Sequence, residues 1–237
     1  LTLDYGPFGF MESFDAGHIC NHSDHMGRYQ YRAQPRVAYR NLYVLGDALS
    51  PLIGRPEQVK DLIDEAFPAA FEARFLQLMR AKLGLVTVRE DDAELIDALF
   101  GLLQAGRADY PAFFRGLSGL PGSIEPAARG HIDAPVRDLF PDRPRCDAFL
   151  AQWRARLAAE GSVDAERQAA MRAVNPKYVL RNWVAEAAIR RAREGDFGGV
   201  AEVLTCLSRP FDEHPSLAHY AAPPPDWAAG LTVSCSS

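Results

Sequence analysis

The stretch 57–83 reads EQVKDLIDEAFPAAFEARFLQLMRAKL, and its apolar residues recur every three or four positions. This spacing is typical of one face of an amphipathic α-helix. Pro68 lies in the middle of the pattern and is expected to kink or split the helix, because proline lacks the backbone N–H that the helix needs. Gly84 follows directly and suits the C-terminal cap. The apolar stripe consists of Leu62, Ile63, Ala66, Phe67, Phe71, Phe75, Leu78 and Met79.

Helical patterns continue on both sides of this stretch, so the predicted fold class is mainly α. Asp92 is expected to cap a helix whose stripe includes Leu95 and Leu99, and Asp109 to cap a short one. Asn175 and Pro176 form a start signal for a helix that would bury Trp183. Five prolines make 119–146 an irregular connector. The other predicted helices span 37–52, 147–160, 164–174 and 197–207.

Composition limits the class of protein. The 237 residues are 48% hydrophobic and 24% charged, which is ordinary for a globular protein. The net charge of -5 argues against a nucleic-acid partner, because such surfaces normally carry a basic excess. No apolar run reaches 18 residues, so no membrane partner is expected either. The four cysteines form no CxxC pair and therefore predict neither a zinc ribbon nor a secreted disulfide scaffold.

Residues 1–34 differ from the rest, because they are rich in Gly, His, Asp and aromatic residues and show no helical period. Leu1–Leu3 is expected to end a short strand, followed by a long loop. Asp4 would follow that strand, with Gly6 close behind it. A carboxylate in this position is a usual ligand for Mg²⁺ that is also bound by nucleotide phosphates.

Four blocks give the chain a resemblance to a known family. They are LDYGPFGF at 3–10, CNHSDHMGRY at 20–29, NPKYVLRNW at 175–183 and VSCSS at 233–237. In this order they resemble the corresponding segments of selenoprotein O-type protein adenylyltransferases. The resemblance runs from residue 3 to residue 237, and the combination is far more specific than any single block.

The resemblance implies a protein-kinase-like fold, of which this chain would be the helical C-lobe, with the N-lobe absent. Residues 1–34 would carry the metal-binding Asp and an activation-segment-like loop, 35–222 the helical body, and 223–237 a C-terminal tail. The implied activity is transfer of AMP from ATP to Ser, Thr or Tyr hydroxyls of protein substrates, with Mg²⁺ or alternatively Mn²⁺. Asp4 would bind the metal and, through it, ATP.

The nucleotide-binding loop and the catalytic base of that family would precede Leu1. The chain is therefore expected to be an inactive fragment without a catalytic base of its own, because nucleotidyl transfer depends on positioning and charge stabilisation. The alternative is a non-catalytic helical binding or redox-regulatory module. The Ala- and Arg-rich composition fits a bacterial source. Members of the family occur in the bacterial cytoplasm and in mitochondria, so the resemblance implies a cytoplasmic protein, or a mitochondrial one if the source is eukaryotic.

Two further features permit more than one interpretation. Cys20 and Cys235 could form a regulatory disulfide, since many eukaryotic members of the family have selenocysteine at the tail position, or they could be unrelated thiols. The cluster around Cys20, which contains His18, His22, Asp24 and His25, fits a hydrogen-bonded loop better than a zinc site, because its spacing is too tight for two ligand pairs. A role in substrate contact or regulation is the third alternative. Cys146 and Cys206 are expected to be structural. In the block at 175–183 an architectural role suffices, although Arg181 and Asn182 could reach the loop after Asp4.

Overall fold

The computed structural model describes residues 11–20 and 24–231, and within them it is mainly helical, with no β-strand. The predicted strand at Leu1–Leu3 lies outside the described residues. The chain divides into two compact units. Among the described residues, the first unit contains residues 16–20 and 24–78, and the second contains 11–15 and 79–231. None of the helices in these ranges is long and apolar enough to cross a membrane.

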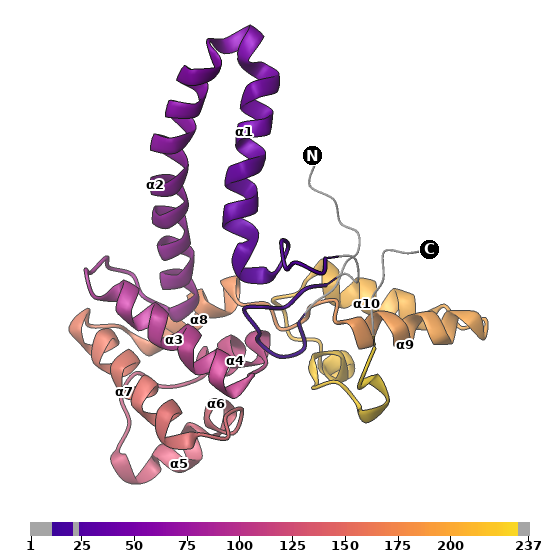
Figure 1. The fold of residues 1–237 in the computed structure, drawn as a ribbon. Helices are drawn as coiled ribbons and strands as arrows, with labels where there is room; N and C mark the ends of the chain where they lie inside the picture. The colour runs from indigo at the N-terminus through magenta and orange to yellow at the C-terminus, as the bar shows by residue number, and fades with distance from the viewer. Residues whose placement is uncertain (1–10, 21–23, 232–237) are drawn as a thin grey trace. The chain divides into compact units, whose positions relative to one another are not determined.

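The first unit is built on a helical hairpin (Figure 1). A short 3₁₀ turn, η1 (Tyr31–Ala33), leads into α1 (Gln34–Ile53), and α2 (Pro56–Leu83) returns after a turn at Gly54. The end of α2, from Met79 on, belongs to the second unit. The two helices approach each other closely at Gly46, where a β-carbon would lie only 2.7 Å from a methyl group of Val59.

Aromatic and hydroxyl groups join the two helices of the hairpin. The ring of Tyr39 on α1 stacks on Phe67 of α2 at 5.4 Å, and Phe67 in turn stacks on Phe71. The hydroxyls of Tyr39 and Tyr43 both donate to the carboxylate of Asp64. These contacts cover only one side of each helix.

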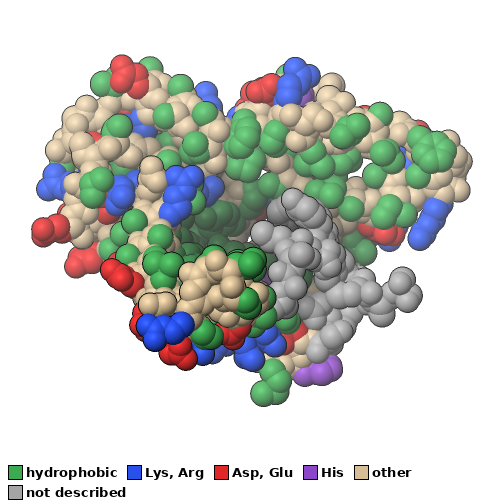
Figure 2. Space-filling view, turned by 90° about the horizontal axis from the view of Figure 1, so that it is seen from above, with side chains coloured by type: hydrophobic (Ala, Val, Ile, Leu, Met, Phe, Trp, Pro, Cys, Tyr) green, Lys and Arg blue, Asp and Glu red, His purple; other side chains and the backbone are tan. Residues whose placement is uncertain are grey.

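The hairpin leaves much of its apolar surface exposed, which the amphipathic pattern at 57–83 does not predict. Leu52 and Leu62 are 83% and 62% exposed, and within the predicted stripe only Met79 is fully buried. Figure 2 shows hydrophobic side chains interspersed with charged ones over one face of the molecule. Pro68, which was expected to kink or split this helix, does not split it, because α2 continues from Pro56 to Leu83 without a break.

The second unit contains the main hydrophobic core. Its helices begin with α3 (Asp92–Gly106) and α4 (Tyr110–Leu117), followed by η2 (Pro126–Ala128), α5 (Arg129–Ile132) and α6 (Ala134–Arg137). Next come α7 (Arg143–Ala159), α8 (Asp164–Val174), α9 (Asn182–Arg193) and α10 (Gly198–Ser208). The 3₁₀ turns η3 (Pro215–Ala221) and η4 (Asp226–Ala228) complete it.

Trp153 lies at the centre of this core. Its side chain is completely buried, and its indole N–H donates to the carbonyl of Leu83 at 2.9 Å. In the predicted stripe of Leu95, Ile96, Leu99, Phe100 and Leu103, all residues are buried as expected except Phe100, which is half-buried. A smaller cluster around Trp183 joins α9, α10 and η3.

Several sequence expectations for this unit can be compared with the structure. Asp109 caps α4 as predicted, because its carboxylate accepts the backbone N–H of Ala112 at 2.9 Å. Asp92 is not a cap: it is the first residue of α3, and its buried carboxylate accepts a hydrogen bond from Arg156 instead. The connector 119–146 is largely irregular as expected, although it contains three short helical turns and α7 already begins at Arg143.

The helix predicted to start at Asn175 was wrong. Asn175 is extended and ends α8, with its N–H donating to the carbonyl of Met171. The chain then remains non-helical until α9 begins at Asn182. The reason is that the backbone N–H groups of Lys177 and Tyr178 both donate to the carbonyl of Pro210, which holds this segment away from a helical path.

Candidate functional site

Residues 11–15, which come after the predicted metal ligand Asp4 in the sequence, pack on the helical body of the second unit. Phe14 is 2% exposed, and its backbone N–H donates to the carbonyl of Ala108 at 2.8 Å. Its ring packs on Phe100 and Tyr110, with centroids 5.6 and 5.9 Å away. An aromatic ring this deeply buried is a strong anchor, since its removal typically costs about 3–5 kcal/mol.

A second anchor, two residues earlier, is electrostatic. The carboxylate of Glu12 lies 3.1 Å from the guanidinium of Arg181, and the same guanidinium lies 2.6 Å from the carboxylate of Asp109. The Arg181 side chain is only 3% exposed. These three residues, which we call the Arg181 cluster, join segments separated by as many as 169 positions in the chain.

Each member of the Arg181 cluster is held by its own element. Asp109 is the N-cap of α4, and its second carboxylate oxygen accepts the N–H of Ala112. Arg181 directly precedes α9. The segment before it is fixed at Asn175, whose side-chain amide donates to the carbonyl of Lys82 at 2.9 Å. The position of the guanidinium therefore depends on the whole 175–183 block and not on Arg181 alone.

The charge balance of the Arg181 cluster is uneven, because one guanidinium faces two carboxylates. One oxygen of Glu12 is buried and has no hydrogen-bond partner. Removing one partner from a buried ion pair leaves an uncompensated charge and typically costs about 3–5 kcal/mol. The cluster therefore holds Glu12 firmly only while Arg181 is present.

The loop 24–33 of the first unit is organised by its own backbone. The carboxylate of Asp24 accepts the N–H groups of Arg28 and Tyr29 at 2.9 and 2.7 Å. These hydrogen bonds, led by that of Tyr29, lower the pKa of Asp24 below its usual value. Gly27 has a positive φ of 68° and allows the tight turn. The end of this loop also contacts the segment that precedes it, because the backbone N–H of Tyr31 donates to the carbonyl of His18 at 3.0 Å.

The sequence-predicted site residues fall into two groups. Asp4 and Cys235 lie outside the described residues, so the metal site and the disulfide are not tested by the structure. Cys20 is half-buried. In the part of the chain that is described, no three His, Cys, Asp or Glu side chains come together as a metal site, and His22 lies outside that part.

The other two cysteines are buried, as the sequence predicted. Cys146 is completely buried, and burial raises the pKa of its thiol to about 12. Cys206 is 2% exposed, and burial raises its pKa as well. Thiols in this state are poor nucleophiles, which supports a structural role for both.

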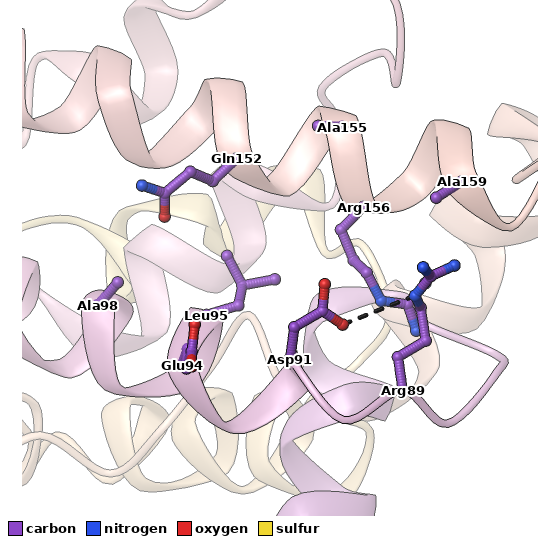
Figure 3. A pocket seen from close by; sticks show the side chains of 9 residues that line it. All are labelled: Arg89, Asp91, Glu94, Leu95, Ala98, Gln152, Ala155, Arg156 and Ala159. Carbon is purple, nitrogen blue, oxygen red and sulfur yellow. Dashed lines mark ion pairs between the residues drawn. The ribbon is translucent and has the colours of Figure 1, made fainter.

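An open groove of about 530 Å³ lies between α3 and α7 (Figure 3). Arg89 and Asp91 form an ion pair at its rim, with nitrogen and oxygen 3.6 Å apart. Arg156 also lines the groove, but its guanidinium is bound by Asp92 and Glu160. The remaining lining, Glu94, Leu95, Ala98, Gln152, Ala155 and Ala159, brings no set of reactive groups together, so we do not assign chemistry to it.

The sequence interpretation missed Glu12 and the pairing of Asp109 with Arg181. Asp109 caps a helix as expected, but capping involves only one of its two carboxylate oxygens. The other oxygen pairs with Arg181, which a capping pattern does not predict. The sequence signal for the cluster was the 175–183 block itself. In this block Arg181 directly precedes α9, and the buried Trp183 lies in the first turn of that helix. The expectation that Arg181 could reach the loop after Asp4 is confirmed by its contact with Glu12, although the local pattern does not identify Glu12 as the partner.

The chain matches the family model described as protein adenylyltransferase SelO over residues 1–208. It is 59% identical over its full length to "Protein nucleotidyltransferase YdiU" of Dechloromonas aromatica (strain RCB), of which it covers 48%. It is 52% identical to the proteins of the same name from Myxococcus xanthus (strain DK1622) and Burkholderia ambifaria (strain MC40-6), covering 47% of each. The chain thus spans about half the length of these curated relatives.

Proposed function

Since the chain belongs to the SelO protein adenylyltransferase family, we propose that it forms the helical half of an enzyme that transfers AMP from ATP to Ser, Thr or Tyr hydroxyls of proteins. The hydroxyl oxygen forms a bond to the α-phosphorus of ATP. The bond from that phosphorus to the bridging oxygen breaks, and pyrophosphate leaves. The hydroxyl proton passes to a base, which we expect in the part of the longer relatives that this chain does not match.

Asp4 is the metal ligand in this proposal. A bound Mg²⁺ neutralises charge on the triphosphate. The described residues contain no set of metal-ligating side chains, so they do not supply this site by themselves. They do anchor Glu12 and Phe14, through the Arg181 cluster and the contacts of the Phe14 backbone and ring. This anchoring of residues 12–14, which follow the Asp-Tyr-Gly block in the sequence, is the observation that supports the proposal.

The proposal is tested with a longer protein that includes the half found in the relatives. It is incubated with ATP labelled at the α- or the γ-phosphate, and the label on protein is counted. We expect label from the α-position only, and none with the 237-residue chain alone. Label from the γ-position only would indicate phosphoryl transfer and contradict the proposal.

Two substitutions make this test specific. Asp4→Asn should abolish transfer, because it removes the charge that binds the metal. Asp91→Asn is the matched control, since Asp91 lies in an exposed ion pair on the groove and should retain full transfer. Equal activity of the two variants would remove Asp4 from its assigned role.

The second candidate function, a redox-regulatory module, rests on the cysteines. We propose that Cys20 and Cys235 form a reversible disulfide, in which both thiols lose a proton and an electron while a small-molecule disulfide is reduced to two thiols. Closing a loop of this size stabilises the folded chain by about 5 kcal/mol in the chain-entropy model. Thiol counting after glutathione disulfide treatment should give two free thiols in the wild type and three in Cys235→Ser, which retains three of the four cysteines. The wild type kept reduced should give four. Four free thiols in the oxidised wild type would contradict this pairing.

A further inference from the structure

We propose that the helical hairpin of the first unit is a docking surface for an amphipathic helix, which belongs to the half of the longer protein that this chain does not match. The surface is one apolar face of α1 and α2 between residues 38 and 76, all of which the structure describes. The inference does not depend on the AMP transfer proposed above, so the two can fail separately.

Each helix of the hairpin carries a row of apolar residues at alternating steps of four and three positions. This is the spacing of the a and d residues by which helices pack on one another. All of these residues except Leu42 and Leu76 are exposed, so the described residues do not supply the packing that the spacing indicates. The row on α1 consists of Ala38, Leu42, Leu45, Leu49 and Leu52, and the row on α2 of Leu62, Ala66, Ala69, Ala73 and Leu76.

The two rows lie on the same side of the hairpin. Gly46 and Val59 face each other between the helices, since a β-carbon on Gly46 would lie 2.7 Å from a Val59 methyl group. At 3.6 residues per turn, the centre of each row is offset from this contact by roughly 60–80° around its helix, in the same rotational sense. Because α1 and α2 run in opposite directions (Figure 1), the same sense turns both rows to one side. Together the rows form one surface, which we call the apolar face.

The apolar face has the shape and length to receive one further helix. Its α1 side is made mostly of leucines, whereas Ala66, Ala69 and Ala73 make its α2 side shallow. Small side chains allow a neighbouring helix to approach closely, because the distance between packed helices depends on the residues at their contact. The row on α2 extends over about 21 Å at 1.5 Å per residue, which matches a helix of about four turns.

The charge beside the apolar face specifies the kind of helix. Glu65 and Glu72 are exposed, lie one heptad apart and flank the α2 row on its outer edge. The equivalent positions on α1 are Asn41 and Ala48, which carry no charge. Since opposite charges pair at such flanking positions, the docked helix is expected to carry Lys or Arg along the edge that faces α2. A second copy of the hairpin offers only an acidic edge and an uncharged one, so charge does not favour self-association.

The length of the relatives indicates where this helix comes from. The chain aligns over its whole length with relatives of which it covers only 47–48%. An exposed apolar surface made of contiguous rows usually marks a site that another protein surface covers. A helix in the other half of the same protein is covalently joined to the hairpin, so its effective concentration exceeds that of a separate partner.

The first experiment measures maleimide labelling of single cysteines introduced into the longer protein, with each labelled site assigned by mass spectrometry. Leu45→Cys and Ala69→Cys lie on the apolar face, and the second changes little volume if the first disturbs folding. Asp47→Cys is the matched control, because Asp47 is exposed on the opposite side of α1. Both face cysteines should react at least about tenfold more slowly than the control, since they become accessible only when the structure opens locally.

Equal labelling at all three positions of the longer protein would overturn the inference. Protection that appears only at concentrations at which sedimentation shows a dimer would assign the apolar face to a second copy and would overturn it as well. A longer protein that shows protection but transfers no label from ATP would contradict only the proposed function.

The second experiment tests the charge of the docked helix. Glu65→Lys combined with Glu72→Lys should speed the labelling of Ala69→Cys in the longer protein by about fivefold, because two exposed charge pairs become repulsive. Asp47→Lys, on the opposite side of the hairpin, should leave the labelling rate of Ala69→Cys unchanged. If the double reversal and Asp47→Lys give the same rate, no basic edge faces α2 and the inference is wrong.

Discussion

Replacing Arg156 with glutamine tests whether buried charge pairs hold the second unit together. Its side chain is 5% exposed and donates to Asp92 at 2.7 Å, to Glu160 at 2.8 Å and to the carbonyl of Thr87 at 2.7 Å. Both carboxylates are only 1% exposed. Without Arg156 they lose their principal positive partner while remaining buried.

The expected cost is large, because breaking a buried ion pair typically removes about 3–5 kcal/mol of unfolding free energy. For a chain of this length that corresponds to a fall in Tm on the order of 10 °C. The matched control is Arg143→Gln, which breaks an exposed pair with Asp138 at 3.0 Å. Exposed pairs contribute about 0–1 kcal/mol, so this variant should unfold close to the wild type.

The pH dependence of the unfolding free energy gives a second, independent test of the role of Arg156. Burial raises the pKa of Asp92 and of Glu160, but hydrogen bonds, led by those from Arg156, lower both pKa values below their usual range. In the wild type these carboxyls therefore contribute stability above the pKa of the unfolded chain, about 4, and this contribution is lost as the pH falls. In the variant burial dominates, so both pKa values rise and the carboxyls take up protons on folding.

The loss of unfolding free energy in Arg156→Gln, relative to the wild type, should therefore be largest near neutral pH and should shrink towards about pH 5. We call this loss the deficit. The assay is urea unfolding followed by circular dichroism at both pH values, with Arg143→Gln alongside. A deficit within about 1 kcal/mol of the control, or one that grows on acidification, would refute the reasoning.

Three further predictions concern single contacts. Trp153→Phe keeps the ring packing but leaves the carbonyl of Leu83 without its donor, so urea unfolding should show a loss of about 1–3 kcal/mol. Gly46→Ala forces a β-carbon to within 2.7 Å of Val59, and thermal unfolding of the chain should show a loss of about 1–3 kcal/mol unless the hairpin opens there without cost. The thiol of Cys146, whose pKa burial raises to about 12, should not react with a disulfide reagent at pH 8 until the protein is unfolded, and rapid labelling of the native chain would show that it is accessible.

The helices of the second unit were largely predictable because their apolar stripes face a core that local periodicity describes well. The stripe containing Leu95 and Leu99 is buried as the spacing indicates. The hairpin shows the limit of the same reasoning: periodicity predicts α2, yet Leu62 remains 62% exposed. A repeat of apolar residues defines a face, but it does not say what covers that face.

The candidate site was less predictable, because its contacts are remote in the chain. The capping role of Asp109 follows from local sequence, whereas its ion pair with Arg181 depends on how α4 and α9 pack. The start signal at Asn175 was misleading for the same reason. Its amide donates to Lys82, a distant residue, and the hydrogen bonds of the following residues to Pro210 override the local preference for a helix.

The Arg181 cluster also restricts how this sequence can vary over evolutionary time. A change at position 181 alone leaves two carboxylates without their shared cation, and a change at position 12 or 109 alone alters the balance of the remaining pair. Joint replacement by apolar residues avoids the buried charge altogether and is often neutral or stabilising. These three positions, far apart in the gene, are therefore expected to change together among relatives, so that a substitution tolerated in one lineage would be harmful in another.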